Sequence, residues 1–231
     1  MQFKLSKPLN TIVYIDGLNL FYSLKKTPYK WLNIEALINS VLDSSWHKII
    51  AIKYFTARVQ STLTDPSKDS RQDIYLQALQ TLQTIEVVYG KFKKRDIKAT
   101  LSIKNPKKLK QIQKIMGRST FQFSKYEEKE TDVNIATHII YDCCKEKISS
   151  IALLSNDTDL KLPLWFARNK FKKRTIVITP PENKNGSLTL KTAQQHLQKI
   201  SHKNISLEEA HLKNSQFPDV VGGISKPKSW V

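Results

Sequence analysis

Short runs of β-branched and aromatic residues alternate along the chain with segments of helical periodicity. Residues 11–15 predict a first strand, and residues 148–155 (ISSIALLS) are apolar almost throughout, which is typical of a central parallel strand. Further strands are expected at residues 49–59, 85–90 and 174–179. Helices are expected at residues 18–25, 33–42, 131–146, 159–171 and 188–200, and in the second part of 65–82. This alternation predicts an α/β fold with right-handed βαβ units and a mainly parallel sheet between two layers of helices.

Local signals refine this outline. Asn33 is expected to cap the second helix, whereas Pro163 should interrupt or bend the helix at residues 159–171. Gly90 is expected to stop the strand that precedes it. Beyond it, residues 99–103 and 120–123 alternate well enough for a hairpin or edge strands, with a helix over residues 106–116 between them.

The chain is long enough for one substantial core. Its 231 residues are 40% hydrophobic and contain neither an internal repeat nor a flexible linker. We expect one domain over residues 1–200 with a basic insertion at 91–125, and a C-terminal extension at 201–231 that packs on it or trails from it.

No apolar stretch reaches membrane length, and the start of the chain lacks the apolar block of a signal peptide. Cys143 and Cys144 are neighbours on a predicted helix and so predict no structural disulfide or metal site, and a cytoplasmic protein is expected.

Positive charge is the strongest compositional signal. Thirty-eight Lys and Arg against twenty Asp and Glu give a formal net charge of +18. Residues 91–125 hold twelve basic residues and one acid, Asp96, so this segment alone has a net charge of +11. A segment this dense in positive charge is more typical of a surface that binds a polyanion than of an ordinary solvated face. Nucleic acid is the first candidate for that partner, and an acidic membrane surface is the second. The expected RNA-binding residues are Lys91, Lys93, Lys94, Arg95 and Lys129, and the expected stacking or core aromatics are Tyr89, Phe92, Phe121, Phe123 and Tyr126.

Acidic residues stand where the predicted strands end. Asp16 ends the first strand, Asp157 and Asp159 follow the most apolar one, and Asp132 opens a helix. Because parallel strands end at one edge of a sheet, these carboxylates are expected to face the same crevice. Converging carboxylates repel one another unless a cation neutralises them, and oxygen ligands suit Mg²⁺ or Mn²⁺.

Each residue also has a purely structural interpretation. Asp16, Asn19 or Asp157 could cap a helix, and Asp132 is favoured near a helix start by the helix dipole. In the functional interpretation Asn19 would orient a water, and Ser155 would offer a hydroxyl beside the metal. We favour the functional interpretation because three acidic sites coincide at one predicted edge.

Three motifs in a fixed order resemble the NYN domain family within the PIN-like nuclease superfamily, which includes the bacterial LabA-type proteins. They are VYIDGLNLFYSL, EEKETDVNIATHIIYD and IALLSNDTDL, and the resemblance spans residues 11–178. It implies a three-layer α/β/α, PIN-like (Rossmann-like) fold and a metal-dependent ribonuclease. The implied metal-binding and catalytic residues are Asp16, Asp132, Asp157 and Asp159, with Asn19 and Ser155 in support.

The chain departs from the family pattern at two positions. Glu130 stands where the family usually has a small residue, so the helix entrance is expected to be more acidic or differently turned. Asn156 stands where the family usually has glycine, although Asn tolerates the left-handed conformation that glycine can adopt in such a turn. Neither change removes an acid.

The leading hypothesis is a Mg²⁺- or Mn²⁺-dependent ribonuclease that hydrolyses RNA phosphodiester bonds. The alternative is an RNA-binding or regulatory module with little turnover. A third possibility, a phosphotransferase or phosphatase, lacks a clear partner pattern for an Asp nucleophile. DNA cleavage, endo- or exonucleolytic mode, the number of metals and assembly into a homo-oligomer stay open at this stage.

Overall fold

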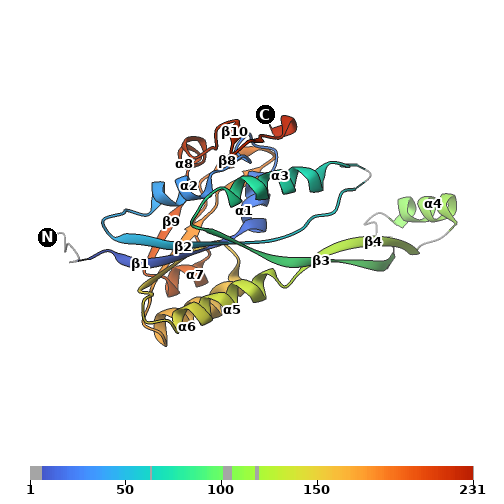
Figure 1. Ribbon diagram of the computed structural model, residues 1–231. Coiled ribbons are helices and arrows are strands. Elements are labelled where there is room, and N and C mark those ends of the chain that lie inside the picture. The colour runs from blue at the N-terminus through green and yellow to red at the C-terminus, as the bar shows by residue number, and fades with distance from the viewer. Residues whose placement is uncertain (1–6, 63, 101–105, 118–119, 231) are drawn as a thin grey trace.

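Seven strands form one central sheet in the computed structural model, which describes residues 7–62, 64–100, 106–117 and 120–230. Their order is β4-β3-β2-β1-β5-β6-β9 (Figure 1). All neighbours pair in parallel except β3 and β4, which are antiparallel. The strands are β1 (Leu9–Asp16), β2 (His47–Ala57), β3 (Ile85–Thr100), β4 (Thr120–Lys129), β5 (Ser150–Leu154), β6 (Arg174–Thr179) and β9 (Lys203–Ser206).

Helices cover both faces of this sheet (Figure 1). One layer contains α1 (Gly17–Leu24), α2 (Ile34–Val41), α3 (Lys68–Gln80) and α8 (Glu209–Asn214). The other layer contains α5 (Thr131–Cys143), α6 (Lys161–Asn169) and α7 (Gln195–Ile200). The α/β fold with a mainly parallel sheet between helices is therefore confirmed. Short elements complete the chain: α4 (Pro106–Met116), the pairs β7 (Glu182–Lys184) with β8 (Ser187–Thr189) and β10 (Val220–Val221) with β11 (Ile224–Ser225), and the 3₁₀ turns η1 (Thr158–Leu160) and η2 (Lys228–Trp230).

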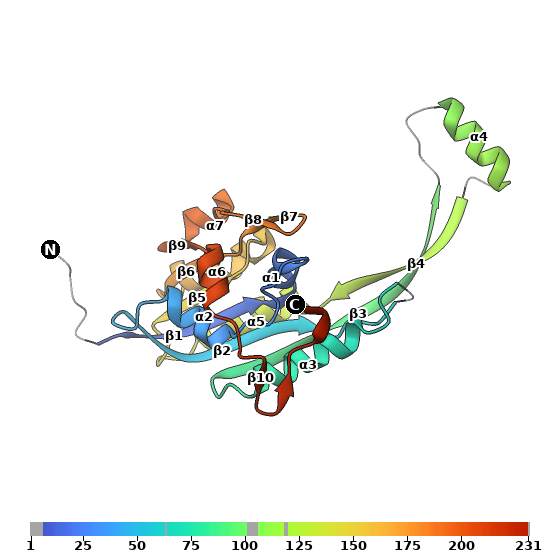
Figure 2. The same ribbon diagram turned by 90° about the horizontal axis from the view of Figure 1, so that it is seen from above.

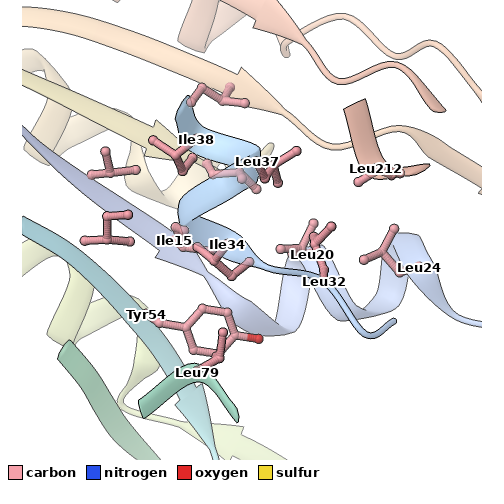
Figure 3. Close-up of a cluster of buried hydrophobic side chains, with 14 of the residues drawn as sticks. Ile15, Leu20, Leu24, Leu32, Ile34, Leu37, Ile38, Tyr54, Leu79 and Leu212 are labelled. Atoms are coloured by element: carbon pink, nitrogen blue, oxygen red, sulfur yellow. The ribbon is translucent and has the colours of Figure 1, made fainter. Parts of the chain in front are cut away.

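The sheet separates two apolar cores. Side chains alternate along β1, so Val13 and Ile15 enter the core beneath α1 and α2, where Leu37 also lies (Figure 3). Ile12 and Tyr14 enter the other core, beneath α5 and α6. Because β1 is covered on both faces, its near-continuous apolar sequence is what a central parallel strand requires.

The second core also holds a buried ion pair that connects α5 to the sheet. Lys53 of β2 donates to Asp142 of α5 at 2.6 Å, and the Tyr14 hydroxyl donates to the same carboxylate at 2.9 Å. A further bond comes from Lys145 at 2.7 Å. Burial opposes ionisation of Asp142, but these hydrogen bonds hold its pKa below the usual value.

Three local expectations were wrong. Gly90 does not stop β3, which continues to Thr100; a Cβ at Gly90 would lie 2.6 Å from Thr131 Oγ1, so the glycine instead allows the strand to cross the start of α5. Pro163 lies in the first turn of α6, where a missing N–H costs no helical hydrogen bond, so it causes no break. The helix expected at residues 188–200 is confined to Gln195–Ile200, and Ser187–Thr189 is the short strand β8.

The antiparallel pair β3–β4 extends beyond the sheet as an arm (Figure 2). Pairing runs from Lys91 opposite Lys129 to Thr100 opposite Thr120, and α4 lies at the far end. The hairpin and the helix at 106–116 are thus confirmed, while residues 101–103 of one expected strand fall outside the described residues.

Residues beyond 200 contribute to the sheet and to a core. β9 pairs with β6, and the Trp230 ring lies 5.8 Å from that of Tyr75 and 6.4 Å from that of Trp31. Cys143 and Cys144 are free thiols. Within the described ranges, no helix has the length and apolar character needed to span a bilayer.

Candidate metal centre

The connection order produces a reversal in strand order at β1. From β1 the chain moves outward to β2 and β3, and it then returns to place β5 on the opposite side of β1. Ligands of open α/β sheets bind at such a switch in strand order. Ile15 of β1 is paired with Leu154 of β5, so the next residues, Asp16 and Ser155, lie side by side at the switch point.

Asp16 is almost fully buried, with 5% of its surface exposed. It is also the N-cap of α1: Oδ1 accepts the Asn19 backbone N–H at 2.9 Å, and Oδ2 accepts the Ser155 hydroxyl at 3.0 Å. Burial raises the pKa of Asp16, and the charges of Asp157 and Glu128 raise it further against the effect of these two bonds. The capping and functional interpretations of Asp16 are therefore compatible.

Gly17 follows Asp16 because the start of α1 passes very close to β2. A Cβ at this position would lie 2.6 Å from the Phe55 carbonyl oxygen and 2.6 Å from the Tyr54 ring. The glycine thus positions Asp16 at the sheet edge with Tyr54 beside it.

The loop after β5 completes the hydrogen-bond network around Asp16. The Ser155 hydroxyl accepts the Asp157 N–H at 3.1 Å, and Asn19 Oδ1 accepts the Asn156 N–H at 3.4 Å. Asp157 caps η1 by accepting the Asp159 N–H at 2.9 Å. Asn19 and Ser155 therefore connect the ends of β1 and β5 to each other.

Asp132 lies in the first turn of α5. Burial raises its pKa to about 6, and the charges of Asp16, Asp157, Glu128 and Asp159 contribute in that order. None of the ion pairs among the described residues includes Asp16, Asp132, Asp157 or Asp159. The result is a group of acids without ion-pair partners in the described part of the chain.

These acids form a loose group. Within the described part of the chain, no three His, Cys, Asp or Glu side chains are arranged to hold one metal ion together. Asp159 is exposed and contributes mainly through its backbone N–H to Asp157. The oxygen donors suit a hard divalent cation that one or two carboxylates hold together with water and substrate oxygens.

Glu128 was absent from the residues proposed for the site from sequence. It lies near the end of β4, accepts the Thr131 N–H at 2.8 Å and raises the pKa values of Asp16 and Asp132. Its position four residues before Asp132 is the sequence signal that could have identified it.

The two departures from the family pattern have different consequences. Glu130 has a left-handed backbone conformation, with φ 79°, at the entrance to α5. Glycine adopts this conformation more readily than a residue with a Cβ. Asn156 is absent from the positive-φ residues, so the loop after β5 does not use the left-handed conformation at this position. Its side chain is used instead, because Oδ1 accepts the Gln194 N–H at 2.8 Å.

The expected RNA-binding cations lie at the base of the arm. Arg95 and Lys129 both lie within 4 Å of Glu127, at 3.6 and 3.5 Å, and Lys91 lies 3.4 Å from Glu130. Lys93 and Lys94 are exposed and form no ion pair among the described residues. Of the expected aromatics, Tyr89 and Tyr126 are exposed and Phe92 is half-buried; the side chains of Phe121 and Phe123 are not described.

Comparison with known proteins places this site in a family. The chain is 32% identical to 6-hydroxy-3-succinoylpyridine 3-monooxygenase HspA of Pseudomonas putida, over 255 aligned positions that cover all of this chain and 78% of that protein. A crystal structure of VPA0982, a protein of unknown function from Vibrio parahaemolyticus, covers 94% of this chain with a TM-score of 0.46 and 12% identity. The model of the NYN domain matches residues 10–201, which include Asp16, Asp132 and the loop after β5. This chain therefore belongs to the NYN domain family, a PIN-like nuclease family.

Proposed function

We propose that this protein is a ribonuclease that requires Mg²⁺ or Mn²⁺ and hydrolyses RNA phosphodiester bonds at the switch point of the sheet. One observation carries the proposal: Asp157 raises the pKa of both Asp16 and Asp132, and none of the three has a cationic partner among the described residues. Repulsion of this kind is relieved when a cation binds.

Asp16, Asp132, Asp157 and Asp159 are the proposed ligands. A bound ion would activate a water molecule and neutralise charge on the reacting phosphate. Ser155 and Asn19 keep the two strand ends in register, so Asp16 and Asp157 stay close enough to act on the same phosphate. A cation bound beside Asp132 would relieve the repulsion that raises its pKa to about 6, and would keep this carboxylate ionised as a ligand.

The arm supplies the proposed RNA contacts. Among the expected RNA-binding residues at the base of the arm, Lys93 and Lys94 are exposed and have no acidic partner in the described part of the chain. Contacts between lysines and phosphates contribute most of the affinity of proteins for nucleic acids. An RNA-binding module with little turnover would use the same cations, so binding alone does not identify an enzyme.

A second candidate comes from the relative of known activity. That protein is named as a monooxygenase of a substituted pyridine, and the identity of 32% extends over the whole of this chain. Insertion of one oxygen atom from O₂ releases the other as water and needs two electrons, which a reduced nicotinamide could supply. This reaction gives the acidic group no evident task, so we rank it second.

The test exposes the purified protein to a mixed RNA pool and a DNA pool, with EDTA and with Mn²⁺, and maps the product ends. In parallel, O₂ consumption is recorded with NADH and 6-hydroxy-3-succinoylpyridine. The proposal expects Mn²⁺-dependent cleavage of internal RNA bonds and no substrate-dependent O₂ consumption. RNA that stays intact in Mn²⁺ would contradict it, and substrate-dependent O₂ consumption would establish the second candidate.

A further inference from the structure

A cavity of about 490 Å³ lies between α1, α3 and the C-terminal residues Ser229 and Trp230. This volume falls within the range of pockets that hold small molecules. Gly17 and Tyr54 belong to its wall, so it lies directly beside Asp16. None of the residues assigned to the metal centre lines it.

The cavity wall is aromatic on several sides. Tyr54, Tyr75 and Trp230 come from β2, α3 and the C-terminal turn, and Phe21 and Tyr22 come from α1. The Tyr54 hydroxyl has no hydrogen-bond partner in the described part of the chain, although only 5% of this residue is exposed (Figure 3). Aromatic faces with one free hydroxyl suit a planar ring that carries polar groups.

Unpaired cations surround this aromatic wall. Lys25, Lys30 and Lys68 line the cavity, and none of them forms an ion pair among the described residues. Lys30 and Lys68 are only half exposed. Burial lowers the pKa of Lys30, and the charges of Arg71 and Lys226 lower it further, while its Nζ lies 5.7 Å from the centre of the Trp230 ring.

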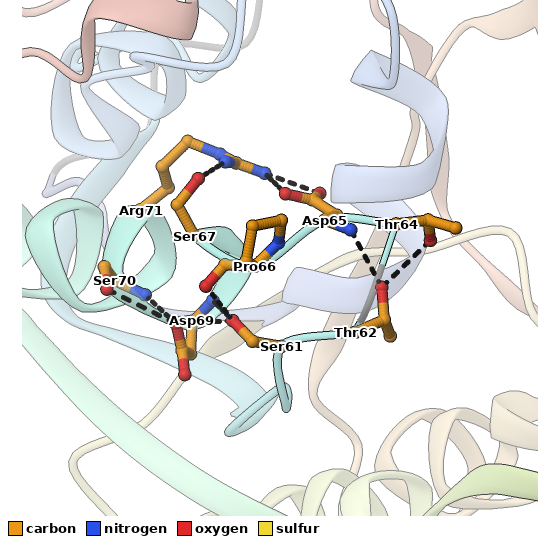
Figure 4. Close-up of polar contacts among 9 residues, drawn as sticks. All are labelled: Ser61, Thr62, Thr64, Asp65, Pro66, Ser67, Asp69, Ser70 and Arg71. Carbon is orange, nitrogen blue, oxygen red and sulfur yellow. Dashed lines mark hydrogen bonds and ion pairs between the residues drawn. The ribbon is translucent and has the colours of Figure 1, made fainter.

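Asp65 is the only acid among the described residues of the cavity wall, and it is already paired. Asp65 accepts two hydrogen bonds from Arg71, at 2.7 and 2.6 Å (Figure 4). The Ser61 hydroxyl holds the same loop, because it lies within hydrogen-bond distance of two acceptors, the Asp69 carboxylate at 2.7 Å and the Pro66 carbonyl at 2.8 Å, and donates to one of them. The described residues of this loop are therefore held by their own hydrogen bonds, and the charged side chains that line the cavity are mostly basic.

We infer that this pocket binds one nucleotide of a single-stranded RNA, with the base against the aromatic wall and a phosphate beside Lys30 and Lys68. The inference rests on the proposed function, because the neighbouring Asp16 site is what makes a nucleotide the expected anionic aromatic ligand. Stacking on aromatic side chains tolerates every base, and lysines hold phosphate as point charges. A nucleotide held here would bring the adjacent phosphodiester to the carboxylates.

The test titrates the full chain, in EDTA, with each of the four nucleoside 5′-monophosphates and with nicotinate, a heteroaromatic carboxylate. At least one monophosphate is expected to bind with a stoichiometry of one. The double variant Lys30→Gln/Lys68→Gln should weaken that binding at least about tenfold, since two charge-assisted contacts are lost. A matched double variant, Lys147→Gln/Lys213→Gln, removes the same charge from exposed positions outside the pocket and should change the affinity less than about twofold.

Three results would overturn the inference: no monophosphate binds, both double variants lose affinity equally, or nicotinate binds while the monophosphates do not. Melting curves confirm that both variants are folded. Because binding is measured in EDTA, it is independent of cleavage. RNA cleavage without monophosphate binding would refute the pocket alone, and Lys30- and Lys68-dependent binding without cleavage would refute the ribonuclease alone.

Discussion

Glu130 occupies a backbone conformation that residues with a Cβ rarely adopt. Its φ of 79° and ψ of −19° lie in the left-handed region, and its side chain makes no capping bond to α5. Its one ion pair, with Lys91 at 3.4 Å, is exposed and so contributes little. The residue therefore stores strain at the entrance to the helix that carries Asp132.

We predict that Glu130→Gly stabilises the protein by about 1 kcal/mol, because glycine adopts this conformation without the Cβ penalty. Glu130→Ala is the matched control, since it loses the same ion pair and keeps the strain. Urea unfolding curves of the three proteins give the comparison. A Gly variant no more stable than the Ala variant would show that Glu130 is unstrained.

Asp132 gives a second prediction at this scale. Its pKa is raised from about 3.8 to about 6, so the folded protein holds this proton more tightly than the unfolded chain. The stability that the protonated form contributes is present at low pH and is lost as pH rises from about 4 to about 6. In EDTA, Asp132→Asn should therefore increase the free energy of unfolding by about 1–2 kcal/mol at pH 8, after allowance for solvent screening, and change it very little at pH 4.

The control for this measurement is Asp219→Asn, which removes an exposed carboxylate far along the chain from the site. Its unfolding free energy should follow that of the wild type at both pH values. An Asp132→Asn effect that is equal at pH 4 and pH 8 would mean that repulsion among the acids does not act on Asp132.

Among the elements, the arm formed by β3 and β4 has the most unusual design. Successive side chains of a strand point to opposite faces, so Lys93 and Lys94 project on different sides. Arg95 shares its side with Lys93 but is close to Glu127, at 3.6 Å. The basic sequence 91–95 therefore presents fewer free cations on any one face than its composition indicates.

We predict that Lys93→Gln/Lys94→Gln reduces the salt dependence of single-stranded RNA binding by about 1.4 units of slope, at ~0.7 per lost contact. Adding Arg95→Gln should reduce it only slightly more, because Glu127 already neutralises part of that charge. The measurement is RNA affinity from low to moderate salt, with Lys147→Gln/Lys213→Gln as the control of equal charge. An unchanged slope in the arm variant would assign the arm to another partner.

At the scale of the whole molecule, the strand order decides where the chemistry can occur. The apolar runs at β1, β5 and β6 predict a parallel sheet from sequence because buried strands need no polar alternation. Because parallel strands end at the same edge of a sheet, the sequence also predicts that Asp16 and Asp157 lie at one edge. These parts of the fold and site follow from local composition.

Other features depend on contacts between distant parts of the chain and could not be predicted from local patterns. Gly90 resembles a strand stop until its close approach to Thr131 is known. Lys53 and Asp142, 89 positions apart, form a buried pair that neither local sequence indicates.

The most direct test of the metal-dependent site compares cleavage of one RNA, at saturating Mn²⁺, by wild type, Asp16→Asn, Asp157→Asn and Asp219→Asn, with RNA affinity measured separately. The account predicts that the first two variants cleave at least about 100-fold more slowly while binding RNA within about threefold of wild type. Asp219→Asn should cleave at the wild-type rate. Near-wild-type cleavage by either Asp16→Asn or Asp157→Asn would contradict the assignment of the carboxylates at the switch point as the catalytic centre.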